Sequence, residues 1–81
     1  MKYEHITHKI IGCAMEVHRE LGNGFQELIY QRSLALEFDQ KKIRYAREVD
    51  MDVSYKGVVV GSRRVDFLLE NKIAVEIKAI K

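Results

Sequence analysis

Three residues near the C-terminal end of the chain have types and spacing that could do chemistry: Asp66, Glu76 and Lys78. They lie in two strand-like stretches joined by a short polar turn at residues 70–72. If this turn has three residues, the hairpin register places Asp66 directly opposite Glu76, and alternation places Lys78 on the same face. A turn of two residues would shift this register.

Two carboxylates opposed in this way are close enough to act together. Directly opposed residues have Cβ atoms about 4.5–5.5 Å apart, where like charges destabilise a sheet. The pair therefore shares a proton, binds a cation or faces open water. Mg²⁺ uses one or two carboxylates together with waters and substrate phosphate. A nearby lysine could hold an attacking water or offset charge in a transition state, so the set suits phosphodiester cleavage.

The same residues have a plainer interpretation, in which they line the solvated face of a sheet. From spacing alone this interpretation is the more frequent one, because short motifs often match by chance. The flanking residues Ala74 and Ile80 argue against it, since they make the charged face partly apolar. A half-buried charged pair requires a reason.

A third carboxylate, Glu27, lies on an otherwise apolar helical stripe with Tyr30 and Leu34, at spacings of three and seven residues. It is either a first-turn acid favoured by the helix dipole or an acid directed at the same cation site. His18, beside the turn at residues 22–24, could border that site.

Two helices are expected in the first half of the chain. Apolar residues recur every three or four positions from Ile6 to Leu21 and predict a helix over 4–21. Gly22 suits the position just after its end, and the following Asn23-Gly24 makes a turn in which either residue can cap the next helix. That helix is expected over 25–41.

The second half has the period of two that is typical of strands. Strands are expected over 43–56, 58–69 and 73–80. The predicted fold class is α+β, with the two N-terminal helices packed on an antiparallel meander of three to four strands. The 81 residues are expected to form a single domain, 1–81.

Composition limits the classes of protein to consider. The net charge is +2, with −2 on residues 1–40 and +4 on residues 41–81, so the basic half either faces an anionic partner or is a solvated surface. The single cysteine, Cys13, excludes a disulfide framework and favours a reducing, cytoplasmic location. No apolar run approaches the roughly 20 residues of a membrane span, so no membrane partner is expected.

Two blocks of the sequence resemble a known family. Residues 17–30 are similar to the signature of the GxxExxY proteins, with Gly24, Glu27 and Tyr30 at the named positions. Residues 65–69 followed by 75–79 are similar to that family's second block. The family belongs to the PD-(D/E)XK nuclease-like superfamily, and the resemblance covers nearly the whole chain.

The resemblance implies hydrolysis of phosphodiester bonds in nucleic acid, with DNA as the expected partner, and Mg²⁺ or Mn²⁺ as the cofactor. Asp66 and Glu76 would bind the metal through their carboxylates, and the backbone carbonyl of Ile77 would complete the protein ligands. Lys78 would position the water and stabilise charge. Glu27 would correspond to the helix acid of many relatives. The resemblance gives no role for Tyr30.

The sequence departs from the family pattern in two ways. Val65 replaces the proline of the superfamily's name, a common variation. The chain stops at Lys81, where relatives continue with a helix and a strand, so the core is expected to be truncated. An exposed edge on the last strand predicts a homodimer or a domain-swapped oligomer.

Two other functions remain open at this point. The chain could be a non-catalytic module that retains the nuclease-like fold and acts by oligomerising or by binding a partner. Its basic half could also bind nucleic acid without chemistry. A divalent cation at the carboxylate pair distinguishes catalysis from both.

Overall fold

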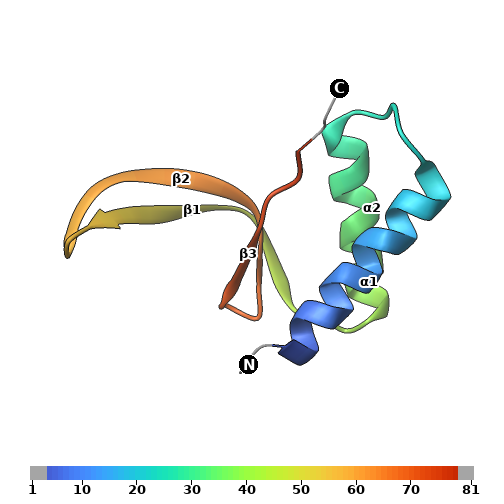
Figure 1. Cartoon of the computed structure of the whole chain (residues 1–81), viewed down its shortest axis with the longest axis horizontal. Coiled ribbons are helices and arrows are strands. Elements are labelled where there is room, and N and C mark those ends of the chain that lie inside the picture. The colour runs from blue at the N-terminus through green and yellow to red at the C-terminus, as the bar shows by residue number, and fades with distance from the viewer. Residues whose placement is uncertain (1–3, 79–81) are drawn as a thin grey trace. The chain divides into compact units, whose positions relative to one another are not determined.

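The computed structural model describes residues 4–78 of the chain. Its elements are α1 (Glu4–Leu21), α2 (Glu27–Gln40), β1 (Tyr45–Tyr55), β2 (Val58–Leu69) and β3 (Ile73–Val75) (Figure 1). The predicted α+β class and the order of the elements are confirmed. The chain divides into two compact units. The helical unit contains the described residues up to Ile43 together with Ile77 and Lys78, and the sheet unit is Arg44–Glu76. The single domain over 1–81 stays a prediction.

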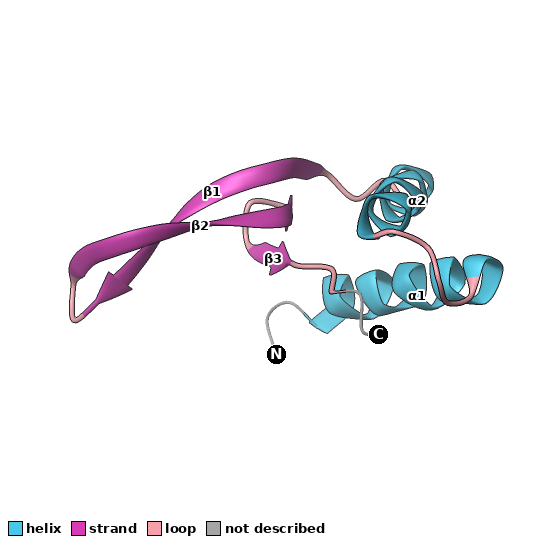
Figure 2. Ribbon diagram, turned by 90° about the horizontal axis from the view of Figure 1, so that it is seen from above, coloured by secondary structure: helices cyan, strands magenta, loops and turns pink. Residues whose placement is uncertain are grey.

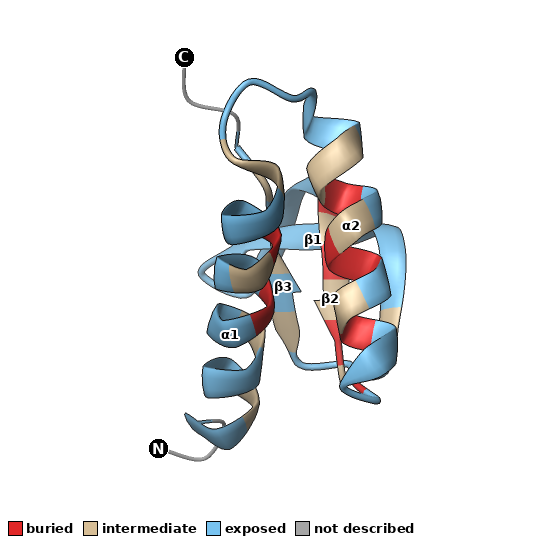
Figure 3. Ribbon diagram, turned by 90° about the vertical axis from the view of Figure 1, so that its right-hand side faces the viewer, coloured by how far each residue is buried: buried red, intermediate tan, exposed pale blue. Residues whose placement is uncertain are grey.

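The helical unit is an antiparallel pair whose buried residues follow the helical period. Cys13 and Val17 are buried on α1, and Gln31, Leu34, Ala35 and Phe38 are buried on α2. Spacings of three and four residues place each set on one face of its helix. Figure 3 shows that the buried stretches of α1 and α2 face each other. Burial also raises the pKa of the Cys13 thiol.

The connection between the helices is set by backbone conformation. The first helix ends as predicted at Leu21, where Gly22 has a φ of +69° and its N–H donates to the carbonyl of His18 at 2.8 Å. Positive φ favours glycine here. The second helix begins at Glu27 rather than at residue 25, because its N-cap Gln26 is extended and makes no side-chain cap. The prediction that Asn23 or Gly24 caps this helix is therefore wrong.

The end of α2 differs by one residue from the prediction of 41, because Lys41 is already the C-cap. Lys42 follows with a φ of +59°, the left-handed position that usually carries glycine. The N–H of Ile43 then donates to the carbonyl of Phe38 at 3.0 Å. This closure satisfies one of the last helical carbonyls.

The sheet unit is a three-stranded meander in the order β1-β2-β3, with both pairs antiparallel (Figure 2). β1 and β2 form a long hairpin whose two-residue turn, Lys56-Gly57, has positive φ at both positions. That is the turn type that matches the twist of a hairpin. The first strand is shorter than the predicted 43–56, and the second has the predicted bounds, 58–69.

The buried side of the sheet is built on alternate residues of β2. Val65, Phe67 and Leu69 are fully buried, and the residues between them are half-buried. The ring of Phe67 contacts the ring of Tyr45 on β1 edge to face, with centroids 5.6 Å apart. This alternation confirms the predicted division of the strand into two faces.

The last strand is much shorter than predicted. β3 ends at Val75 instead of residue 80. Residues 76–78 are not in a strand, and residues 79–81 lie outside the described part of the chain. A longer ladder would place Glu76 against Asp66 and Lys78 against Arg64. Like charges directly opposed destabilise a sheet, which accounts for the early end of the strand.

Between residues 4 and 78, neither helix has the length and apolar character that a bilayer-spanning helix needs.

Candidate functional site

The register of the β2–β3 hairpin brings the two candidate metal-binding carboxylates to adjacent positions. Phe67 pairs with Val75 and Leu69 with Ile73, which is the register predicted from a three-residue turn. Asp66 and Glu76 are the next residues in this register. The ladder stops one step earlier, so Glu76 directly follows the last paired residue instead of forming a pair with Asp66.

Glu76 already has a cationic partner on the neighbouring strand. Its Oε1 lies 3.4 Å from Nη1 of Arg63, and its side chain is 32% exposed. Glu76 lies beyond the last paired residue of β3, so strand alternation does not fix the face to which its side chain points. The expectation that Asp66 and Glu76 share one face stays a prediction. Exposed pairs of this kind contribute at most about 1 kcal/mol, so this one can be exchanged for a cation.

The other candidate residues belong to the helical unit. Glu27 is the first residue of α2 and is exposed, as the first-turn acid of that helix. Ile77 is half-buried and Lys78 is exposed, in the non-strand stretch after β3. Asp66, Glu27 and Ile77 each make at least one further polar, electrostatic or ring interaction. The sheet unit thus contributes Asp66 and Glu76, and the helical unit contributes the rest.

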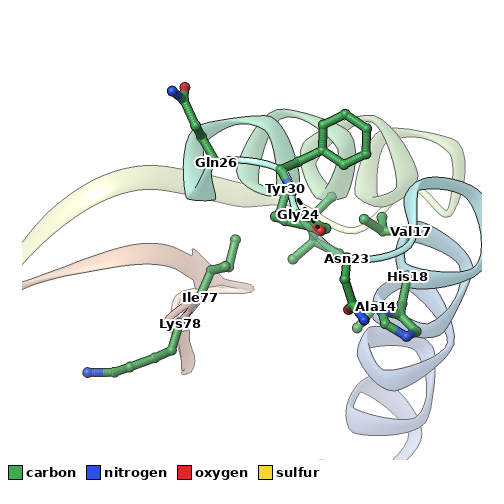
Figure 4. A pocket seen from close by; sticks show the side chains of 11 residues that line it. Ala14, Val17, His18, Asn23, Gly24, Gln26, Tyr30, Ile77 and Lys78 are labelled. Atoms are coloured by element: carbon green, nitrogen blue, oxygen red, sulfur yellow. Dashed lines mark hydrogen bonds between the residues drawn. The ribbon is translucent and has the colours of Figure 1, made fainter. Parts of the chain in front are cut away.

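Ile77 and Lys78 line a cavity of about 640 Å³ in the helical unit (Figure 4). Its walls come from the second half of α1, the turn that follows it and the start of α2. They include Val17, His18, Asn23, Phe25, Tyr30 and Leu34. His18 lines this cavity, and its predicted place beside the cation site stays a prediction. The cavity was missed by the sequence reasoning because it joins residues 14–34 to residues 77–78.

Tyr30 fixes the turn that forms one wall of this cavity. Its hydroxyl donates to the carbonyl oxygen of Gly22 at 2.5 Å and accepts from the N–H of Phe25 at 3.4 Å. Gly24, between these two residues, has a φ of +100°. Helical side chains point toward the N-terminus of their helix, so Tyr30, one turn after Glu27, can reach back to the turn. The structure thereby assigns Tyr30 a role that the sequence did not give.

The oxygen atoms available near the end of β3 suit a hard divalent cation. The carboxylates of Asp66 and Glu76 and the carbonyl of Ile77 are all oxygen donors, as Mg²⁺ prefers, and Mg²⁺ commonly keeps several waters. The described residues contain no group of three or more His, Cys, Asp or Glu side chains arranged to hold a metal ion. These oxygen donors thus suit a hard cation by their chemistry alone, and among the described residues His5 and His8 are in no such group.

Two other carboxylates of the sheet unit form hydrogen bonds with arginines. Asp50 accepts from Arg64 at 3.1 Å, and this hydrogen bond and the arginine's charge lower the pKa of Asp50. Glu70 accepts from the backbone N–H of Arg44 at 3.2 Å and from its side chain at 3.0 Å, and these bonds lower the pKa of Glu70. Both carboxylates therefore help to hold β1 in place.

Comparison with known proteins identifies the family. A family model described as the PD-(D/E)XK nuclease superfamily matches residues 4–81. Searches of the curated proteins and of the solved structures gave no match. The match extends over nearly all of the sequence, including both helices, the hairpin with Asp66 and the stretch from Glu76 to Lys78. The chain belongs to the PD-(D/E)XK nuclease superfamily.

Proposed function

We propose that this protein hydrolyses phosphodiester bonds of nucleic acid, DNA in the first place, with Mg²⁺ or Mn²⁺ as its cofactor. The observation that carries the proposal is the β2–β3 register. In this register Asp66 and Glu76 are the two residues next to the Phe67–Val75 pair, one on each side of the hairpin, in a member of a nuclease superfamily. An all-oxygen donor set at this point supports a hard cation.

Each residue has a distinct part in this proposal. The carboxylates of Asp66 and Glu76 and the backbone carbonyl of Ile77 hold the cation. A cation bound there supplies Lewis-acid polarisation of the phosphate and a water of lowered pKa. Lys78 contributes a positive charge that orients a water or offsets the charge gained by the phosphate. Glu27 is the supporting acid from the start of α2.

Arg63 has to be included in this mechanism. It forms an ion pair with Glu76, so it neutralises the charge of this carboxylate. A cation held by Glu76 would take the place of the guanidinium, and Arg63 would then be available to a phosphate of the substrate. Arginine suits that second role because its fork matches phosphate oxygens.

The first test is the thermal stability of the protein with and without Mg²⁺ or Mn²⁺. A cation at ten times its dissociation constant should stabilise the protein by about 1.4 kcal/mol. In a domain of this size the melting temperature then rises by about 5–10 °C. Glu76→Gln and Asp66→Asn should abolish the rise. Asp52→Asn is the matched control, because it removes an exposed carboxylate of β1 and should leave the rise intact.

The second half of the test is cleavage. Plasmid DNA, single-stranded oligonucleotides and RNA are incubated with the wild type and the same variants. Loss of cleavage in Lys78→Met with an unchanged cation-induced rise in melting temperature would support the division of roles. A wild type whose melting temperature does not respond to 10 mM metal would refute the proposed site.

A second function, as an oligomerising module, is favoured by the outer half of the β1–β2 hairpin. Val53, Tyr55 and Val58 are 41%, 63% and 62% exposed. Tyr55 pairs directly with Val58, and Val53 pairs with Gly61. These three apolar side chains therefore share one face of the hairpin. A second copy of the chain would remove that face from water, in a homodimer or a domain-swapped oligomer.

Light scattering coupled to size-exclusion chromatography tests this second function. The wild type should elute as a dimer at high concentration, and Val58→Lys should shift it toward the monomer. Ser54→Lys is the control, because Ser54 neighbours the apolar face but points to the other side. A monomeric wild type at the highest soluble concentration would refute the oligomer.

A further inference from the structure

We infer that the cavity of the helical unit binds a single unstacked nucleobase of the nucleic-acid substrate. The inference rests on the proposed function and narrows its substrate to single strands or frayed ends, where a base is free to leave its stack. The volume of about 640 Å³ lies within the range of about 300–1,000 Å³ that is usual for small-molecule sites.

The walls of the cavity suit the flat face of a base. Val17, Leu34 and Ile77 provide apolar surface, and Phe25 provides an aromatic ring that is 47% exposed. This ring is held edge to face by Tyr30, with centroids 6.2 Å apart and the planes at 79°. The backbone of Phe25 is fixed as well, since its N–H donates to the Tyr30 hydroxyl. A ring positioned before binding loses little entropy when a base stacks on it.

Two polar side chains at one end of the cavity suit the edge of a base. The side chains of His18 and Asn23 lie next to each other there (Figure 4). Within residues 4–78, neither side chain has a hydrogen-bond partner, so both can serve a ligand. An asparagine amide offers a donor and an acceptor, the pattern that matches the edge of adenine. The imidazole offers either function.

The charge of the lining favours a nucleotide over a cationic or neutral ligand. None of the residues that line the cavity, all of them within the described chain, is acidic. Lys78 contributes a positive charge, and its side chain extends outward from the cavity (Figure 4). The apolar interior and the amide thus take the base, and the ammonium outside takes a phosphate.

The inference is tested by two-dimensional ¹H–¹⁵N NMR titration of the full chain with each of the four deoxynucleoside monophosphates. The titration is run in EDTA, so that binding to the cavity is measured without a divalent cation. The side-chain amide of Asn23 and the backbone amides of Gly22 and Gly24 should shift. Deoxyribose 5-phosphate and inorganic phosphate, which lack the base, should bind at least tenfold more weakly.

Variants separate stacking from apolar contact. Phe25→Leu keeps apolar volume but removes the ring, and should weaken nucleotide binding by about fivefold or more. Phe25→Tyr should retain binding, which shows that the loss is not due to misfolding. Asn23→Ala should reduce the preference among the four bases. Leu36→Ala changes an exposed apolar residue of α2 outside the cavity and should have no effect.

The outcomes distinguish this inference from the proposed function. Glu76→Gln should bind nucleotides in EDTA as the wild type does, even though it no longer responds to metal. Base-free phosphates that bind as tightly as nucleotides would overturn the inference, and so would shifts confined to β1–β3. Nucleotide affinity that rises only on dilution of the protein would mean that a second copy fills the cavity, which would also overturn it.

Discussion

The hydroxyl of Tyr30 donates a hydrogen bond of 2.5 Å to the carbonyl oxygen of Gly22. This bond joins the first turn of α2 to Gly22, the residue that follows α1. It spans a connection in which Gly22 and Gly24 both have positive φ, so the tyrosine restrains the most permissive part of the backbone. The restrained turn also carries Asn23 and Phe25, which line the cavity.

Tyr30→Phe should therefore destabilise the protein while leaving the ring contact with Phe25 in place. Loss of the bond to Gly22 should lower the free energy of unfolding by about 1 kcal/mol, because a half-buried carbonyl loses its partner. Urea denaturation measures the difference. Tyr55→Phe, at an exposed tyrosine of the hairpin, should have little effect. Equal destabilisation by both variants would contradict the role given to Tyr30.

Two glycine substitutions should change stability in opposite directions. Gly24 has a φ of +100°, so Gly24→Ala should cost about 1–2 kcal/mol from backbone strain alone, since a Cβ there meets no atom within 4 Å. Gly12 lies inside α1 with equally open space around it. Gly12→Ala should stabilise by about 0.5–1 kcal/mol, because alanine loses less entropy in a helix. Thermal unfolding of both variants checks the signs, and a neutral Gly24→Ala would contradict the strain.

Removal of the guanidinium that competes for Glu76 should strengthen cation binding. Arg63→Met frees the carboxylate from its 3.4 Å partner and should raise the affinity for Mn²⁺ by up to about fivefold, the equivalent of an exposed ion pair. Isothermal titration calorimetry measures the change. Arg64→Met is the matched control, because Arg64 is paired with Asp50. If the affinity for Mn²⁺ rises equally in both variants, the cause is the change in net charge and not the loss of the Arg63–Glu76 ion pair.

Glu70 should make stability depend on pH on the acid side of neutrality. Its pKa is lowered in the folded state, first by the backbone N–H of Arg44 and then by that arginine's side chain. Its contribution is therefore complete above its ordinary pKa of about 4.3 and is lost as the pH falls toward the folded-state value. Urea denaturation from pH 6 to pH 3 should show a decline that is smaller in Glu70→Gln. A loss of stability in Glu70→Gln as large as that of the wild type would contradict the role given to Glu70.

The hairpin register and the limits of α1 could be predicted because they depend on local residues. The turn at residues 70–72 determines which residues pair across β2 and β3, and Gly22 marks the end of α1. The extent of β3 could not be obtained from its apolar alternation. It depends on which charged residues would face each other at the next positions of the ladder, and these can be named only once the register is known.

The candidate site was predictable only as a set of residues. Asp66 and Glu76 are found from chain spacing, but the Arg63–Glu76 ion pair crosses from one face of β2 to the end of β3 and has no periodic signal. The cationic residues Arg63 and Arg64 are adjacent, and only the structure distinguishes the partner of each. The role of Tyr30 likewise depends on backbone atoms of the turn, which no side-chain pattern records.

A β-bulge in the β1–β2 ladder changes which residues of β2 point to each face of the hairpin. Val53 pairs with Gly61 and the next residue, Ser54, pairs with Val59, so Val60 is an extra residue of β2. Between the bulge and the C-terminal end of β2, the odd-numbered residues such as Gly61 share a face with Val53. Between the turn and the bulge, the even-numbered Val58 shares that face. In a strand without a bulge, residues three apart such as Val58 and Gly61 would point to opposite faces, and the extra residue returns Val58 to the face of Val53. The face to which the residues near the hairpin turn point thus depends on the number of residues in β2 and not on their types.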